Sequence, residues 1–110
     1  MKVNINNIGG EKVRSNDIYE LFDNNSLNDL ILSSTKLKPK KQTTGHSHSG
    51  QEEVYFFIDG KGLMILGDKE IPVQDGDVIL VPDGEFHRVI NTTNNSLYFV
   101  CVFNGKRYDK

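Results

Sequence analysis

Three histidines and one nearby glutamate are the residues of this chain whose types and spacing best fit a metal site. His46 and His48 are separated by one residue, so an extended backbone turns both imidazoles to the same face. Glu53 follows after a gap that can hold a turn, and His87 comes from a later part of the chain. Imidazole nitrogens and a carboxylate oxygen are ligands that transition-metal dications accept. These four side chains are therefore a candidate metal-binding set.

The elements that must bring these ligands together have the pattern of short β-strands. Apolar runs are separated by turn residues such as Gly, Asp and Asn, and helical periodicity is absent after residue 30. Strands are expected at 29–37, 54–58, 63–66, 78–81, 87–90 and 97–103. Residues 59–62 are expected to form a hairpin turn. This spacing is typical of an all-β sandwich or barrel.

The N-terminal part of the chain differs from this pattern. Its first residues, about 25 of them, are polar and rich in Asn, and Gly9-Gly10 is expected to form a turn. Asn16 is a suitable cap for one short helical turn over residues 17–22. That turn is the only helix expected in the chain.

Two of the expected strands are apolar on both faces, which predicts a covering surface outside the barrel. The runs at 54–58 and 97–103 carry hydrophobic residues at odd and even positions alike. One face can line a barrel interior, and the other needs a second sheet or a second subunit. In a chain of 110 residues a second copy is the simpler cover, so we expect a homodimer.

Length, charge and cysteine content exclude several classes of function. The chain has 110 residues and a formal net charge of −2, which fits one domain and argues against a nucleic-acid partner. It has no apolar run of the roughly 18 residues that span a bilayer, and its first residues lack the apolar core of a secretory signal. Cys101 is the single cysteine, so no internal disulfide can form. These features predict a cytoplasmic protein without a membrane partner.

Two spaced motifs around the candidate ligands resemble the signatures of the cupin superfamily. The first signature runs His-x-His, three or four residues, Glu, six residues, Gly, and this chain has it at His46, His48, Glu53 and Gly60. The second runs Gly, five residues, Pro-x-Gly, two residues, His, three residues, Asn. It is matched at every fixed position by Gly76, Pro82, Gly84, His87 and Asn91. The resemblance covers about residues 30–103.

The signatures also decide between neighbouring residues and expose one departure. The six-residue spacing to Gly60 selects Glu53 over Glu52, and strand alternation points Glu52 to the opposite face. Asn91 is expected to satisfy backbone groups near a strand end and not to bind metal. The leading glycine of the first signature is replaced by Lys40. A left-handed backbone there would cost about 1 kcal/mol, and the alternative is a turn of a different kind. Metal binding depends on neither.

The resemblance implies a jelly-roll (double-stranded β-helix) barrel of antiparallel strands over residues 27–110. Residues 1–26 would then be an N-terminal extension able to contribute a strand to the dimer. One divalent transition metal (Fe, Mn, Ni, Co, Cu or Zn) would be held by His46, His48, Glu53 and His87. An octahedral ion with these ligands keeps two positions open for water, oxygen or substrate.

The resemblance leaves the function between two classes. One is a metal-dependent enzyme acting on a small oxygenated substrate, as a sugar or sugar-phosphate isomerase or as a dioxygenase. The other is a non-catalytic module that uses the metal to bind or sense a small molecule. A scaffold with a structural ion is a third reading. The fold and the ligand set do not choose among them, and no general acid or base is identified.

Overall fold

The nine strands in the described part of this chain lie in two antiparallel β-sheets. The structure is a computed structural model and describes residues 1–105 and 107, which contain no helix. The strands are β1 (Glu11–Ser15), β2 (Tyr19–Asn24), β3 (Leu30–Leu37), β4 (Glu53–Asp59), β5 (Lys61–Leu66), β6 (Lys69–Gln74), β7 (Val78–Val81), β8 (His87–Ile90) and β9 (Leu97–Asn104). The expected all-β class is therefore confirmed. None of these elements is a helix long and apolar enough to span a bilayer.

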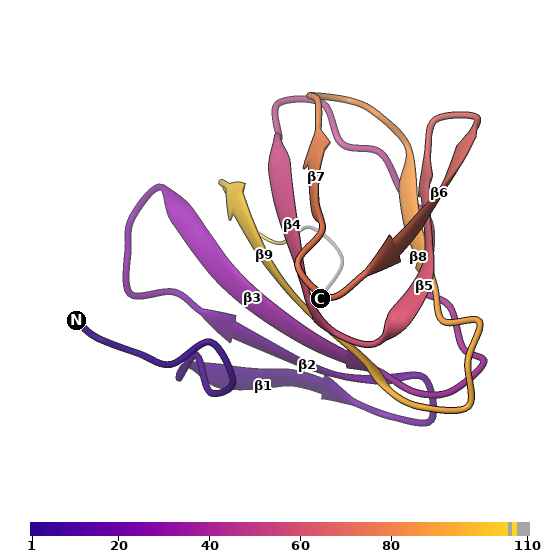
Figure 1. Cartoon of the computed structure of the whole chain (residues 1–110). Coiled ribbons are helices and arrows are strands. Elements are labelled where there is room, and N and C mark those ends of the chain that lie inside the picture. Colours follow the sequence, from indigo (N-terminus) through magenta and orange to yellow (C-terminus); the bar gives the residue numbers. More distant parts are fainter. Residues whose placement is uncertain (106, 108–110) are drawn as a thin grey trace.

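The strand order shows how a barrel is closed from segments that are distant in sequence. The larger sheet has the order β1-β2-β3-β9-β4-β7, and the smaller has the order β6-β5-β8. The two sheets face each other (Figure 1). A core cluster contains side chains from both sheets. Its buried members are Leu37, Tyr55, Phe57, Met64, Val73, Val81, Val89, Leu97, Phe99 and Cys101.

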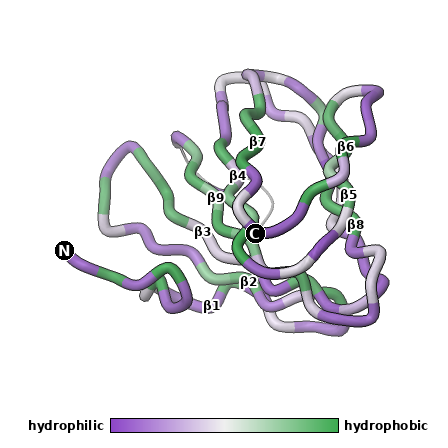
Figure 2. Tube along the Cα trace, viewed as in Figure 1, coloured by the Kyte–Doolittle hydropathy of each residue, from purple (hydrophilic) through white to green (hydrophobic). Residues whose placement is uncertain are grey.

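All six strands expected from apolar runs are present, with ends shifted by one or two residues at most. The hydropathy of the trace explains this agreement, because β7 and β9 are largely hydrophobic and the connections between strands are mostly hydrophilic (Figure 2). Strand β6 was not expected because it is polar and contains Pro72. It pairs only with β5, at the edge of the smaller sheet, where a proline is tolerated.

The expected helical turn after Asn16 is wrong, because residues 19–24 form strand β2. Asn16 Oδ1 accepts hydrogen bonds from the N–H groups of Ile18 (2.9 Å) and Tyr19 (3.0 Å). The same side-chain bonds that cap a helix here close the turn between β1 and β2. Strands β1 and β2 extend the larger sheet beyond β3 of the same chain.

The expected hairpin at residues 59–62 is also wrong. Strand β4 pairs with β7 and β9, whereas β5 pairs with β6 and β8. This connection therefore carries the chain from one sheet to the other. Gly60 is needed there because its φ is +113° and a Cβ would lie 2.8 Å from the carbonyl oxygen of Ser96.

Asn91 follows β8 and forms hydrogen bonds with backbone groups near the end of β3 and the start of β9, as its place in the second signature indicated. Its side chain is 1% exposed. Its Nδ2 donates hydrogen bonds to the carbonyl oxygens of Leu37 (3.1 Å), Lys38 (3.1 Å) and Asn95 (2.7 Å). A buried amide with these backbone partners is a structural residue and does not line the candidate metal site.

Lys40 is a non-glycine residue with a left-handed backbone, at φ +62°. Replacing Lys40 with glycine is expected to raise the free energy of unfolding by about 0.5–1 kcal/mol, because relief of the backbone strain exceeds the added entropy of the unfolded chain. Urea denaturation of the two proteins measures the difference. Lys41→Gly is the matched control, since Lys41 is not among the residues with positive φ, and it should lower stability. A loss of stability in both variants would contradict the prediction.

Candidate metal centre

The backbone of the segment before β4 places His46 beside His87. Residues 41–48 run antiparallel to β8 as an irregular extended segment. The N–H of His46 donates to the carbonyl oxygen of His87 (3.2 Å), and the N–H of His87 donates to that of His46 (3.0 Å). This reciprocal pair fixes the two backbones, so the imidazole centroids lie 4.5 Å apart. Two residues 41 positions apart are thus held by a local β-bridge.

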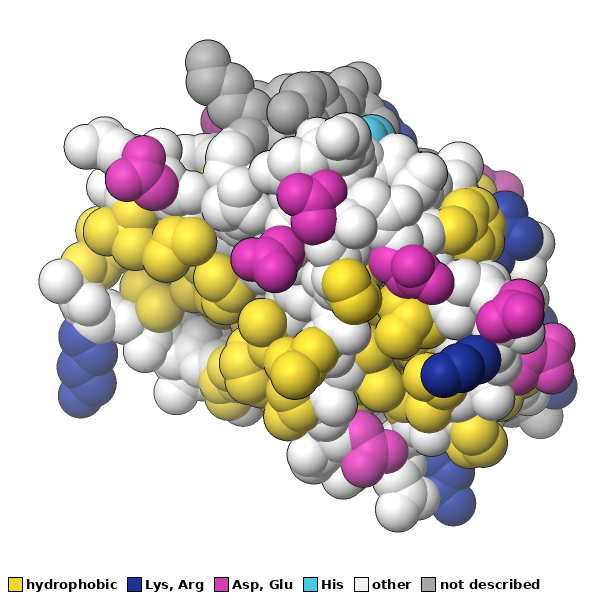
Figure 3. Space-filling model, turned by 90° about the horizontal axis from the view of Figure 1, so that it is seen from above, with side chains coloured by type: hydrophobic (Ala, Val, Ile, Leu, Met, Phe, Trp, Pro, Cys, Tyr) yellow, Lys and Arg dark blue, Asp and Glu magenta, His cyan; other side chains and the backbone are white. Residues whose placement is uncertain are grey.

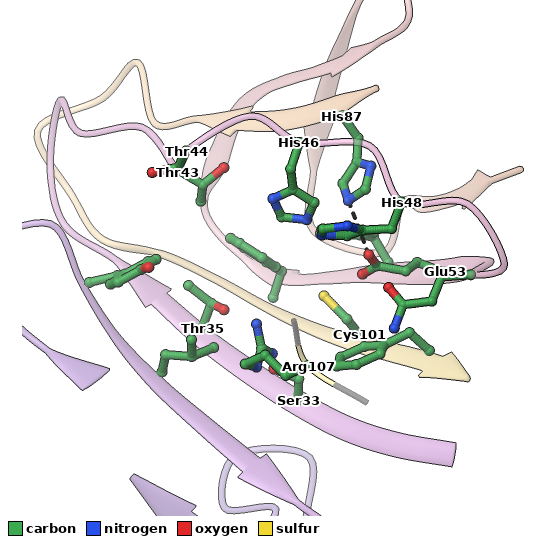
Figure 4. Close-up of a pocket in the computed structure, with 16 residues that line it drawn as sticks. Ser33, Thr35, Thr43, Thr44, His46, His48, Glu53, His87, Cys101 and Arg107 are labelled. Carbon is green, nitrogen blue, oxygen red and sulfur yellow. Dashed lines mark hydrogen bonds and ion pairs between the residues drawn. The ribbon is translucent and has the colours of Figure 1, made fainter. Parts of the chain in front are cut away.

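Glu53 enters the same site from the first position of β4, in the opposite sheet. One ligand atom from each of His46, Glu53 and His87 lies within 4.8 Å of the other two. His87 Nε2 is 3.0 Å from Glu53 Oε1, and their side chains are 5% and 10% exposed. Figure 4 shows these three side chains converging in the cavity. Two imidazoles and one carboxylate in a shielded position are a donor set that fits a transition-metal dication.

A hydrogen bond on the far side of the His87 ring selects which nitrogen can bind metal. His87 Nδ1 lies 3.0 Å from the carbonyl oxygen of Glu85. A carbonyl oxygen only accepts, so Nδ1 carries the proton and donates it to this bond. In the neutral ring, Nε2 then has a lone pair for a metal, and its 3.0 Å contact with Glu53 Oε1 is a hydrogen bond only when a proton lies between the two atoms. A backbone carbonyl commonly orients metal-binding histidines in this way.

His48 lies next to this group but outside it. Its ring centroid is 4.7 Å from that of His46, and His48 is not among the three residues whose ligand atoms lie within 4.8 Å. Its carbonyl oxygen accepts a hydrogen bond from the N–H of Gly84 (3.2 Å), which anchors the loop. Three of the four expected ligands therefore converge, and the fourth, His48, lies beside them.

The choice of Glu53 over Glu52 agrees with the alternation of β4. Glu52 is exposed, and its N–H donates to Asn104 Oδ1 (2.9 Å). Tyr55 and Phe57, which share the parity of Glu53, are 7% and 1% exposed and lie in the core. The inward face of β4 therefore begins with a carboxylate and continues into packed aromatic rings.

The wall below the metal-binding residues is apolar and holds two weakly acidic groups in their neutral forms. Burial, with smaller effects from Cys101 and the Glu53 carboxylate, raises the pKa of Tyr55 well above its ordinary value. Burial and the Glu53 carboxylate likewise raise the pKa of the Cys101 thiol. Both stay protonated at neutral pH, so Cys101 is an inert buried thiol there.

Several polar residues of the cavity were not anticipated from the sequence. They are Tyr19, Ser33, Thr35, Thr43, Thr44, Gln51 and Arg107. Arg107 follows β9 and forms an ion pair with Asp23 of β2, with Nε 2.6 Å from Oδ2. Asp23 has the same parity in β2 as Leu21, so strand alternation could have indicated that its side chain points inward. No local sequence pattern indicated that Arg107 lines the cavity.

The arrangement can hold an ion at a cavity wall and leave space in front of it. Residues from β2, β3 and β9 line the rest of the cavity. An ion held from one side by protein ligands keeps coordination positions for a small molecule, which is a feature of catalytic and ligand-binding sites.

Comparison with known proteins finds curated relatives of this chain. The chain is 36% identical to the oxalate-binding protein of Thermotoga maritima over 61% of this chain and 55% of that protein. It is 33% identical to the glucose-6-phosphate isomerase of Thermococcus kodakarensis over 79% of this chain and 53% of that enzyme. The chain thus spans about half the length of these curated relatives.

A solved structure matches nearly the whole chain. The crystal structure of a protein described as a predicted oxalate decarboxylase from Thermotoga maritima superposes with a TM-score of 0.79 and 26% identity, covering 94% of this chain and 98% of that one. The family profile described as "Cupin domain" matches residues 33–103. That match covers well over half of the sequence and includes all four expected ligands, so the chain belongs to the cupin family.

Proposed function

We propose that this protein binds one divalent transition metal through His46, His48, Glu53 and His87 and acts on a small oxygenated substrate bound in front of it. The observation that carries the proposal is the convergence of His46, Glu53 and His87 from two opposite sheets. A rotation of the His48 side chain would complete the set, because its ring already contacts that of His46.

In this proposal, the residues of the chain bind the metal and orient the ligands and the substrate. A bound dication would supply Lewis acidity, polarising an oxygen atom of the substrate. The carbonyl oxygen of Glu85 holds His87 in the tautomer that leaves Nε2 for the ion. The packed aromatic residues behind the site exclude water, and the hydroxyl groups of Thr35 and Thr43 line the cavity where substrate oxygens would lie.

A non-catalytic binding module is the second candidate. Apart from the histidines and Glu53, the titratable groups among the described cavity residues are Tyr19, Tyr55, Cys101 and Arg107. Burial raises the pKa values of Tyr55 and Cys101, so neither exchanges a proton readily near neutral pH. A relative named as an oxalate-binding protein fits this alternative, and relatives named as isomerases fit the first.

The metal set can be tested by single substitutions. Wild-type protein is expected to bind one equivalent of a dication such as Mn²⁺ or Zn²⁺. The variants H46A, E53Q and H87A are each expected to lose affinity by about tenfold or more, because each removes one donor atom. Isothermal titration calorimetry with elemental analysis measures this, and H48A tests the fourth ligand.

Glu52→Gln is the matched control for Glu53→Gln, since the two residues are adjacent and Glu52 points to solvent. It should bind metal as the wild type does. An unchanged metal affinity in Glu53→Gln, or uptake of less than a tenth of an equivalent by wild-type protein, would contradict the proposed site.

Turnover separates the enzyme from the binder. Metal-loaded protein is expected to convert ¹³C-labelled oxalate or fructose 6-phosphate, and the metal-free protein and H87A are expected not to. Nuclear magnetic resonance of the ¹³C label measures the conversion of either substrate. Binding of a ligand without conversion of either substrate would support the non-catalytic module instead.

We also propose that the outer face of the larger sheet forms a homodimer interface. Val54 lies opposite Leu80 and Phe56 opposite Val78 on that face, because Tyr55 between them points inward. Val78 and Leu80 are 49% and 68% exposed on β7, at the edge of the sheet. One face of the molecule shows hydrophobic side chains gathered in its middle among acidic ones (Figure 3).

Leu80→Glu is expected to shift the protein from dimer to monomer, because it places a charge in the apolar interface. Analytical ultracentrifugation at micromolar concentrations measures the shift. Leu27→Glu is the control, since Leu27 is 65% exposed and lies outside this face. A monomeric wild-type protein, or equal effects of both substitutions, would contradict this interface.

A further inference from the structure

Arg107 brings a positive charge into the cavity from a part of the chain remote from the metal ligands. Gly105, at φ +83°, turns the chain after β9, and its N–H donates to the carbonyl oxygen of Asp29 (3.0 Å). The side chain of Arg107 lines the cavity and is 12% exposed. Figure 4 shows Arg107 and Ser33 across the cavity from His46 and His87.

Asp23 and Ser33 hold the guanidinium in one orientation. Arg107 Nε donates to Asp23 Oδ2 (2.6 Å), and Nη2 donates to Asp23 Oδ1 (2.8 Å) and Ser33 Oγ (2.9 Å). The Asp23 side chain is 1% exposed, so this bidentate pair is shielded from water. A guanidinium that is fixed in a plane before the ligand arrives loses little freedom when it binds.

The charges around the cavity favour an anionic ligand. The Asp23–Arg107 pair is neutral, and Glu53 offsets only half of the charge of a bound dication. With a dication bound, one net positive charge would therefore remain in this shielded space. The guanidinium also acts on the cavity wall: against the larger effects of burial, it lowers the pKa values of Tyr55 and Cys101.

The space between the two walls favours a small ligand. The cavity volume is about 60 Å³, and His46 and His87 lie on one side of it with Arg107 on the other. A short carboxylic acid suits a space of this size between a metal site and a guanidinium.

From these contacts we infer that Arg107 is a second anchor of the ligand site and selects a small carboxylate, with one end at the metal and the other at the guanidinium. This inference rests on the proposed metal function. Asp23 and Ser33 then act as positioning residues, because they orient Arg107 and do not themselves contact the ligand.

The test measures binding of oxalate, malonate and neutral oxamide to protein loaded with Mn²⁺, by isothermal titration calorimetry. Wild-type protein is expected to bind a dicarboxylate at least tenfold more tightly than oxamide. Arg107→Met is expected to lose about ten- to hundredfold in dicarboxylate affinity, the value of a charge-assisted hydrogen bond, with Mn²⁺ affinity unchanged. Arg107→Lys should recover part of the loss, since it restores charge without the fork.

Arg107→Met leaves Asp23 buried without its cation and can impair folding, so a double variant accompanies it. Asp23→Asn with Arg107→Gln replaces the ion pair with two amides and keeps the net charge of the pair at zero. It is expected to show the same loss of dicarboxylate affinity. Lys69→Gln on exposed β6 removes one positive charge elsewhere and should leave affinity unchanged.

The outcomes distinguish this inference from the metal site itself. Protein that takes up Mn²⁺ but binds oxalate no better than oxamide overturns the role of Arg107 and leaves the metal proposal standing. The same holds if a folded double variant binds dicarboxylates as tightly as the wild type, which assigns the ion pair a purely structural role. Protein that takes up no metal overturns both proposals.

Discussion

The contact between His87 and Glu53 is the constraint on which the site depends, because it joins the two sheets across the barrel. His87 begins β8 of the smaller sheet, and Glu53 begins β4 of the larger one. Their 3.0 Å separation, together with the backbone bridge between His87 and His46, sets three donors at one point. A dication bound at this point would be held by donors from both sheets.

Much of this geometry was predictable because the signatures record backbone requirements as well as ligands. Gly60 needs its positive φ where the chain crosses between sheets, and Asn91 needs three carbonyl oxygens near the end of β3 and the start of β9. Lys40 adopts a left-handed backbone, which is one of the two possibilities that the missing glycine left open. Residue types at such positions are restricted by sterics, so their spacing specifies the barrel and, with it, the convergence of the ligands.

The remaining features depend on contacts that leave no local pattern. Asn16 has the same side-chain bonds whether it caps a helix or closes a β-turn, so its type could not decide between them. Strand β6 is polar because it lies at a sheet edge, which only the topology reveals. Asp23 and Arg107 are 84 positions apart, and neither lies in a motif. Sequence periodicity reports which face is buried, but it does not report which partner covers it.

The metal-binding wall of the cavity could be predicted from the sequence and the opposite wall could not, because the two walls are built differently. The metal-binding wall is formed by residues 46–87, where ligand spacing and turn glycines restrict each other. The opposite wall is formed by β2, β3 and the residue after Gly105, which are joined only through tertiary contacts. A buried ion pair is weak support for stability, since desolvation offsets much of its attraction. The Asp23–Arg107 pair is therefore better explained by the orientation it gives the guanidinium in the cavity than by a contribution to stability. Substitutions in this wall would change which small molecule is preferred and would leave the metal-binding residues in place.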